Sequence, residues 1–322
     1  MRITLVVPGL LSLPPDALAR DAALSRLATL ASPDAESDLD SAILADLGLD
    51  ASPAPIAALG AGVDVGTCWV ARADPVSIVI GRDDARIEDV VLDLSDPERE
   101  ALVALLDAHF AEDGLTFAAP RADAWFALMR APQSVRSVPP ERALRSSLRS
   151  SLPSGQDAGR WRRWITETQM LLHEHPLASR RRPVTSLWFS GGGVLPPPGT
   201  LPRVGVQAAP GREGDLLRGI ARLLGHDAPT PVALRKQLDS NVGNTAILAL
   251  TVIQRPETLA SLATDFLSPA LDALGRSQVS AVKLIASGEG GTGSWTARKG
   301  SWLTRWTQRR VAFTPPPDPI KA

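Results

Sequence analysis

The chain has 322 residues, of which 44% are hydrophobic and 21% are charged, and these proportions are typical of a soluble globular protein. A single cysteine, Cys68, excludes an intramolecular disulfide framework and fits a reducing compartment. The opening residues MRITLVVPGLLSLPP contain an apolar run, but it is too short to span a membrane and is interrupted by Pro8. We therefore expect a cytoplasmic protein.

Charge is divided unevenly along the chain, although the net charge is only −1. Residues 1–119 carry 21 acidic side chains against 7 arginines, and residues 120–322 carry 14 acidic against 27 basic side chains. The favoured interpretation is that the two parts face and neutralise each other; the alternative is a basic pocket for an anionic ligand such as a phosphate or a carboxylate. Nucleic acid is disfavoured, because the pI lies below 7 and the arginines form short, separated runs.

Residues 1–62 are expected to begin with a strand and a helix. Ile3–Val7 is apolar and β-branched and is stopped by Pro8-Gly9, which predicts a strand. Leucines at helical spacing predict a helix over 16–30. Residues 31–62 are rich in Ala, Ser, Asp, Pro and Gly, and we expect a surface excursion there with one short helix around 39–47.

Residues 63–130 have the pattern of a β-rich section. Ser95 and Glu98 have the spacing of a capping box, which predicts a helix that Gly114 ends. Residues 131–156 are rich in Pro, Ser and Arg and are interpreted as linker-like. Alternation of apolar and polar residues predicts strands over 69–71, 76–80, 86–92, 115–118 and 125–129, with a turn at 81–84.

The C-terminal half alternates strands and helices, which predicts a largely parallel sheet between layers of helices. We expect a single α/β domain over 1–322, with a three-layer core from 1–30 and most of 184–290, in which Ile3–Val7 pairs beside C-terminal strands. The 63–130 section extends this sheet or forms a subdomain, and the tail 314–322 is expected to be disordered. The expected strands are 184–189, 203–207, 245–253 and 281–286, and the expected helices are 215–224 and 256–274.

The block 152–193 concentrates tryptophan, histidine and arginine. A helix is expected from its N-cap Asp157 to His175, with Trp161 and Trp164 as core residues on one face.

The pair His173 and His175 looks like a metal signature, but residues two apart on a helix point about 200° away from each other. Both imidazoles can reach one ion only if the helix breaks between them. Pro176 leaves such a break open, because it disfavours helical geometry at the preceding residue.

The next strand ends in three glycines, which is typical either of a loop whose N–H groups approach an anion or of a tight turn at a sheet edge. We predict that the glycines and the end of the preceding helix converge at one concave surface, to which Arg180–Arg182 supply positive charge. No catalytic residue is assigned, and neither a metal ligand nor a cofactor is expected. The candidate anion or ligand pocket consists of Glu167, His173, Arg180, Arg181, Trp188, Ser190, Gly191, Gly192 and Gly193.

The block QDAGRWRRWITETQMLLHEHP, followed by TSLWFSGGG, resembles the bacterial RpfE-type regulatory protein family. The segments VVPGLL, TCWVARADPVSI and LLDAHFAEDGLTFAAP fit the same pattern in the same order, so the resemblance runs from the first strand to Gly193. Proteins of this family look distantly similar to cofactor-independent phosphoglycerate mutases of the alkaline-phosphatase superfamily. The resemblance implies an alkaline-phosphatase-like fold with a bimetal site at the strand ends.

The ligands for such a bimetal site are depleted in this sequence. Two adjacent divalent ions need about six to eight Asp or His ligands, and in the superfamily the first strand delivers an Asp-Gly pair. Here it delivers Pro8-Gly9, and Gly290 stands where the resemblance leads us to expect a histidine. The favoured hypothesis is a non-catalytic regulatory or anion-binding protein, which binds a small anionic ligand or a protein partner and neither nucleic acid nor a membrane.

Two alternatives stay open. One is an active cofactor-independent phosphoglycerate mutase or related phosphotransferase, which would use a divalent metal and Ser12 or Ser190 as nucleophile. For this alternative, Asp16 and Glu289 are acids that could replace lost metal ligands. The other is a protein-interaction module, in which tryptophans and arginines form a partner surface.

Overall fold

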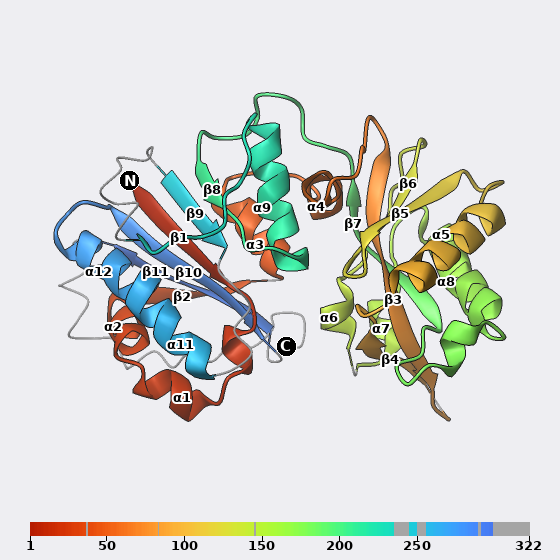
Figure 1. The fold of residues 1–322 in the computed structure, drawn as a ribbon, viewed down its shortest axis with the longest axis horizontal. Helices are drawn as coiled ribbons and strands as arrows, with labels where there is room; N and C mark the ends of the chain where they lie inside the picture. Colours follow the sequence, from red (N-terminus) through yellow and green to blue (C-terminus); the bar gives the residue numbers. More distant parts are fainter. Residues whose placement is uncertain are drawn as a thin grey trace. The chain divides into compact units, whose positions relative to one another are not determined.

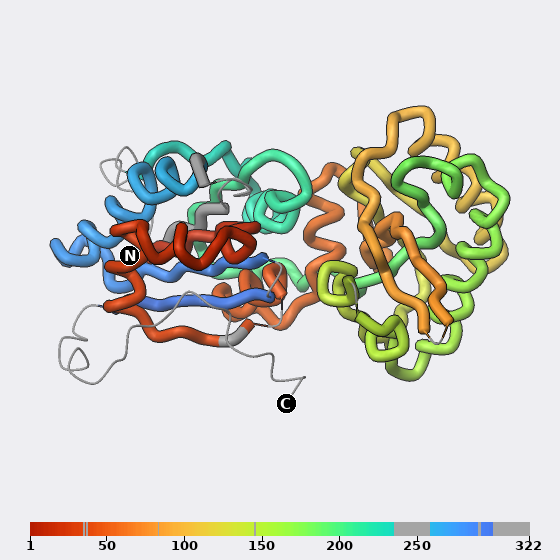
Figure 2. Tube along the Cα trace, turned by 90° about the horizontal axis from the view of Figure 1, so that it is seen from below, coloured from red at the N-terminus to blue at the C-terminus, as the bar shows by residue number. Residues whose placement is uncertain are grey.

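The computed structural model describes residues 1–36, 38–82, 84–144, 146–234, 245–249, 256–288 and 291–298. The chain divides into two compact units: Met1–Asp50 with Pro198–Ala322, called the mixed-sheet unit, and Ala51–Pro197, called the antiparallel unit. Figure 2 follows the chain out of the mixed-sheet unit, through the orange, yellow and green antiparallel unit, and back. The mixed-sheet unit is therefore built from two segments that lie far apart in sequence.

A six-stranded sheet of order β2-β11-β10-β1-β9-β8 forms the centre of the mixed-sheet unit. β1 pairs in parallel with β10 on one side and with β9 on the other, and β8 extends the parallel part beyond β9. Figure 1 shows red β1 between cyan β9 and blue β10, which confirms the predicted pairing of Ile3–Val7 with C-terminal strands. The strands are β1 Arg2–Val7, β2 Ala31–Glu36, β8 Gly205–Gln207, β9 Thr245–Ala249, β10 Ala281–Gly288 and β11 Gly291–Arg298.

The two remaining strands, β11 and β2, are antiparallel additions that the sequence did not predict. β11 returns from β10 as a hairpin and contributes Trp295, which is fully buried. β2 falls within the predicted surface excursion. It carries Pro33 and Asp34, residue types that discourage a sheet edge from pairing with another chain.

Helices pack on both faces of this sheet. On one face Ile3, Leu5 and Val7 share a buried cluster with leucines of α1, α2, α11 and α12. On the other face, Thr4 donates a hydrogen bond to Oδ2 of Asp46 in α3 at 2.7 Å. Successive side chains of a strand alternate between faces, so the two sets of helices lie on opposite sides. The helices are α1 Pro15–Arg20, α2 Ala22–Leu30, α3 Leu39–Asp46, α9 Arg212–Leu223, α11 Pro256–Leu262 and α12 Ser268–Gly275.

Both long helices predicted for this unit are interrupted. Asp21 has an extended backbone that ends α1, and its carboxylate accepts hydrogen bonds from the N–H groups of Ala23 and Leu24, which starts α2. Between α11 and α12 the chain makes a π-helical turn, η3 Ala263–Leu267. The spacing of apolar residues therefore predicted which faces of these segments are buried, but not where the helices are interrupted.

A five-stranded antiparallel sheet organises the antiparallel unit, and its strand β3 pairs with β4, β6 and β7. The strand predicted over 184–189 is β7. Its assignment to the parallel core is wrong, because β7 pairs with β3 of the β-rich section. The strands are β3 Trp69–Ile80, β4 Ala85–Val90, β5 Leu115–Arg121, β6 Ala124–Met129 and β7 Ser186–Gly193.

Helices also cover both faces of the antiparallel sheet. On one face Trp69 shares a buried cluster with residues of α5 Asp96–His109 and α8 Ala158–Leu172, including Trp161 and Trp164. The neighbouring Val70 faces the other way and packs with Ala57 and Ala58 of α4 Pro53–Ala61. The capping box of Ser95 and Glu98 at the start of α5 is confirmed.

Two segments that the sequence assigned to the surface or to a linker are packed. Residues 31–62 contain β2, α3 and α4, and Ile56 in α4 is fully buried. Residues 131–156 lie within the antiparallel unit and contain α6 Pro140–Ala143 and α7 Leu148–Ser151. The single domain over 1–322 stays a prediction, and the tail 314–322 lies outside the described residues.

Candidate functional site

The glycine run Gly191–Gly193 belongs to strand β7 and is not a loop. A Cβ built on Gly192 would overlap the indole ring of Trp69, and one built on Gly193 would overlap the Ser52 side chain. Gly191 has a φ of +64°, and a Cβ there would lie 3.0 Å from Cγ of Pro53. The glycines therefore allow Trp69 and the start of α4 to approach β7 closely, and this packing explains the run without an anion.

Helix α8 runs antiparallel to β7. The predicted pocket combined the C-terminal end of α8 with the glycine run of β7, and this orientation separates the two. The hydroxyl groups of Thr168 and Ser186 are 3.0 Å apart, and the rings of Trp161 and Phe189 are 5.0 Å apart between centroids. Gly193 lies seven residues beyond Ser186, which is about 23 Å of extended chain. The C-terminal end of α8 therefore lies at the opposite end of β7 from the glycines.

The other predicted pocket residues have separate surroundings. Oε1 of Glu167 lies 3.2 Å from Nε of Arg163, one turn earlier on α8. His173 is exposed at the C-cap of α8. Trp188 is fully buried, and its Nε1 donates a hydrogen bond to the carbonyl of Val138 at 2.8 Å. The structure thus does not bring Glu167, His173 and Trp188 together with the glycine run.

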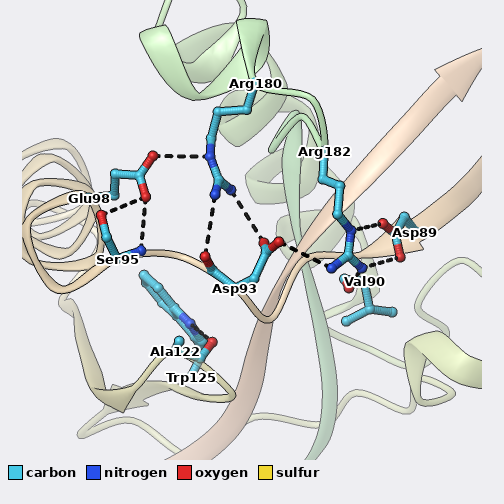
Figure 3. A network of polar contacts seen from close by, with 9 residues as sticks. All are labelled: Asp89, Val90, Asp93, Ser95, Glu98, Ala122, Trp125, Arg180 and Arg182. Atoms are coloured by element: carbon cyan, nitrogen blue, oxygen red, sulfur yellow. Dashed lines mark hydrogen bonds and ion pairs between the residues drawn. The ribbon is translucent and has the colours of Figure 1, made fainter.

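Arg180 and Arg182 are held by acidic residues around β4 and the start of α5 (Figure 3). Nε and Nη2 of Arg182 donate to the two carboxylate oxygens of Asp89 at 2.6 and 2.9 Å. Nε of Arg180 lies 3.0 Å from Oε1 of Glu98, and Asp93 contacts both arginines. These guanidinium groups are therefore already engaged by carboxylates, and Arg181, which lies between them in sequence, is exposed.

Hydrogen bonding stabilises the ionised state of this network. The hydroxyl of Ser95, and then its backbone N–H, lower the pKa of Glu98, with a smaller contribution from the charge of Arg180. The hydrogen bond to Asp89 raises the pKa of Arg182 above its ordinary value. The acids come from the acidic part of the sequence and the arginines from the basic part, as the neutralisation interpretation expected.

The ends of β1 and β10 in the mixed-sheet unit form what we call the closed edge, comprising Pro8, Gly9, η1 Leu10–Ser12 and Gly288. Pro8 and Leu10 are buried, and Gly9 has a φ of 79°. A Cβ built on Gly288 would overlap the backbone of η1. Ligands of open parallel α/β sheets bind outside the carboxyl ends of the strands. Here that position is filled by proline, leucine and closely packed backbone.

The closed edge does not fit the bimetal centre that the family resemblance implies. Pro8 has no donor atom in its side chain, and Asp16 lies on the surface of α1, 3.3 Å from Arg20. Ser190 is only 2% exposed within β7 and is no open nucleophile, whereas Ser12 is exposed. Glu289 and Gly290 lie outside the described residues. Over the described ranges, no group of three or more His, Cys, Asp or Glu side chains is placed to hold a metal ion.

A polar cluster lies on the α3 face of the mixed sheet. Nζ of Lys283 is 3.6 Å from Oε1 of Glu36 and 3.7 Å from Oδ1 of Asp46. Asp46 also accepts the hydrogen bond from Thr4, and Glu36 accepts one from the hydroxyl of Ser294 at 2.7 Å. Both carboxylates and the ammonium have partners, which indicates a structural network across the sheet.

A hollow of about 430 Å³ lies in the antiparallel unit and is lined by residues 133–136, Ser154 and Gly155. The sequence interpretation missed it because 131–156 was read as a linker. A high content of Pro and Ser indicates the lack of regular structure, not the lack of tertiary contacts. The antiparallel bridge between Arg136 and Ser154 joins positions that are 18 residues apart, so local sequence patterns could not reveal it.

Together these elements define an α/β protein with one mixed and one antiparallel sheet. The chain is similar to the cofactor-independent phosphoglycerate mutase from Thermoplasma acidophilum DSM 1728, with 16% identity and a TM-score of 0.44 over 93% of this chain and 90% of that one. It is also similar to the PH0037 protein from Pyrococcus horikoshii, with 16% identity and a TM-score of 0.46 over 92% of this chain and 87% of that one. Likenesses at this level carry no argument about activity or substrate.

No protein-family model matches the sequence, and no curated protein matches it. The RpfE-type assignment therefore stays a prediction. Within the described part of the chain, none of the helices has the length and apolar character needed to cross a membrane.

Proposed function

We propose that this chain is a non-catalytic, cytoplasmic regulatory or anion-binding protein on a three-layer α/β scaffold of the phosphoglycerate-mutase and alkaline-phosphatase kind. The sequence resemblance supports the kind of scaffold. The packing of the closed edge supports the lack of turnover. The kind of scaffold and the lack of turnover are independent parts of the proposal, and either one can be wrong while the other holds.

The observation that carries the proposal is the structure of the closed edge. A bimetal centre needs carboxylate or imidazole atoms about 2.0–2.6 Å from each ion, together with space for a substrate. Pro8 supplies no such atom at the end of β1, and the contact between Gly288 and η1 leaves no space for a side chain at the end of β10. A ligand would therefore bind elsewhere on the chain.

The test is an activity assay on the purified chain with 3-phosphoglycerate for mutase turnover and a chromogenic phosphate monoester for phosphatase turnover. The chain is assayed as isolated and after incubation with Mn²⁺ and with Mg²⁺. We expect no turnover above that of metal and buffer alone. Turnover that is abolished by a chelator would contradict the proposal. The Ser12→Ala variant is the control: loss of that turnover in the variant assigns it to this chain instead of a contaminant.

A further inference from the structure

We propose that residues 299–313 bind to an acidic surface of their own chain, formed by β2 and α3, and that salt releases them. This segment, KGSWLTRWTQRRVAF, follows β11 directly and lies outside the described part of the chain. It contains four bases and no acid, and its apolar side chains include two tryptophans. The contact is independent of the proposed function, because it involves neither the closed edge nor turnover.

The segment 31–50, which contains β2 and α3, has the opposite charge. It carries six acidic residues and no base, and two of the acids belong to the polar cluster around Lys283. Asp34 and Asp50 are exposed, and neither side chain forms an ion pair or a hydrogen bond with another described residue. These two carboxylates are therefore accessible to a basic partner.

Asp34 lies on the face of the mixed sheet that carries α3. In the pairing of β2 with β11, Asp34 is opposite Ser294. Two residues later on β11, Thr296 is opposite Lys283 of β10. Alternate residues of a strand share a face, so Asp34 is on the same face as Lys283 and its partner on α3. Ser32 and Asp34 are both exposed, so the described helices leave this part of the face open to solvent.

The chain leaves β11 close to this acidic surface. Arg298, the last residue of β11, is opposite Ala281, and Ala281 pairs with Arg2 of β1. Nη2 of Arg2 donates to the carbonyl oxygen of Asp46, the last residue of α3, at 2.7 Å. The chain therefore leaves β11 at the end of the sheet where α3 ends, and the C-terminal end of a helix favours cations.

The segment is long enough to reach both exposed carboxylates. The residue opposite Asp34 precedes Arg298 by four positions, which is about 13 Å of strand. Asp50 follows the end of α3 by four residues, which span at most about 14 Å. Arg305 and Arg310 follow Arg298 by seven and twelve residues, which span at most about 25 and 42 Å.

The strength of such a contact depends on salt. Ion pairs between exposed side chains are individually weak. The Debye length is about 30 Å at 10 mM salt and about 3 Å at 1 M, so several weak attractions act together only at low salt. Because the segment and the acidic surface belong to one chain, their effective concentration does not change with protein concentration. We expect a segment that is bound at low salt and released at high salt, at any protein concentration.

Trypsin cleavage after Arg305, Arg309 and Arg310, followed by mass spectrometry, measures release of the segment in the full chain. Cleavage after Arg82, an exposed residue of the antiparallel unit, is the internal reference for changes in protease activity. The ratio of segment cleavage to reference cleavage should rise at least about fivefold between about 10 mM and about 1 M NaCl. An unchanged ratio would overturn the inference. A ratio that falls as protein concentration rises at low salt would assign the segment to a second copy and overturn it as well.

Variants separate the acidic surface from the general charge of the unit. The double variant Asp34→Asn/Asp50→Asn should raise the ratio at low salt at least about threefold, because the segment loses two carboxylates. The matched control Asp16→Asn/Asp227→Asn removes the same charge from exposed residues of the mixed-sheet unit outside β2 and α3, and should leave the ratio unchanged. Equal ratios in the two double variants would show diffuse attraction and overturn the inference.

Discussion

The two units of the chain differ in how far the side chains of their ion pairs are exposed to solvent. In the mixed-sheet unit, the side chains of Lys283, Glu36 and Asp46 are 15%, 16% and 4% exposed. In the antiparallel unit, those of Arg182 and Asp89 are 42% and 37% exposed. Water screens exposed ion pairs, whereas a buried charge without its partner is costly. The enclosed cluster of Lys283, Glu36 and Asp46 therefore contributes more to the stability of the fold than the solvent-exposed arginine network does.

The comparison is tested most strongly by removing the cation of the enclosed cluster. Lys283→Met should lower the free energy of unfolding by about 3 kcal/mol, because two largely buried carboxylates lose their common partner. Arg182→Gln is the matched control in the antiparallel unit and should cost less than about 1 kcal/mol. Urea unfolding at neutral pH measures both. Equal effects in the two variants would remove the distinction between the units.

The glycine run in the antiparallel unit gives the next largest effect. Gly192→Ala should lower the free energy of unfolding by about 2–3 kcal/mol, because the added methyl group overlaps the indole of Trp69. Gly159 lies in α8 with nothing within 4 Å of a built Cβ, so Gly159→Ala should be neutral or stabilising by up to about 1 kcal/mol. A Gly192→Ala protein with an unchanged urea midpoint would leave the packing explanation without support.

The closed edge of the mixed-sheet unit should respond in the same sense but less strongly. Gly288→Ala should cost about 1–2 kcal/mol, because the methyl group would lie 2.4 Å from the backbone of η1, a smaller overlap than the 2.1 Å approach of a Cβ on Gly192 to the indole of Trp69. Gly275→Ala is the control, since the nearest atom to its built Cβ is 4.0 Å away. The melting temperatures of the two variants are measured by thermal unfolding. Equal melting temperatures would mean that the end of β10 can accept a methyl group without a clash.

The smallest expected effect concerns pH. The pKa of Glu98 is lowered in the folded protein, so its contribution to stability is present above the unfolded pKa and is lost as pH falls through the folded pKa. Glu98→Gln should be less stable than the original chain at pH 7 by less than about 1 kcal/mol, and the difference should vanish near pH 3. Urea midpoints at both pH values test this; a difference that is the same at both would contradict it.

The success of sequence reasoning depended on whether the signal was local. Ile3–Val7 was predicted as a strand because an apolar, β-branched run ended by Pro-Gly is a local signal. The capping box of Ser95 and Glu98 was also predicted, since both partners lie within one helical turn.

The errors concern contacts between distant positions. Gly191–Gly193 were interpreted as an anion loop or a turn, but their packing depends on Trp69 and α4, more than a hundred residues earlier. Arg180–Arg182 were assigned to a ligand pocket because the partners of Arg180 and Arg182, Asp89 and Asp93, lie about ninety residues earlier in the sequence. Residue type alone does not tell an arginine that binds a ligand from one that binds a neighbouring carboxylate.

The central claim is that the closed edge holds no pair of catalytic metal ions, and a Mn²⁺ titration of the purified chain followed by electron paramagnetic resonance tests it most directly. The account predicts weak binding without a defined stoichiometry, because Pro8 offers no ligand and Gly288 lies against η1. Two ions bound per chain with affinity on the order of micromolar or tighter, together with mutase turnover that a chelator removes, would contradict it.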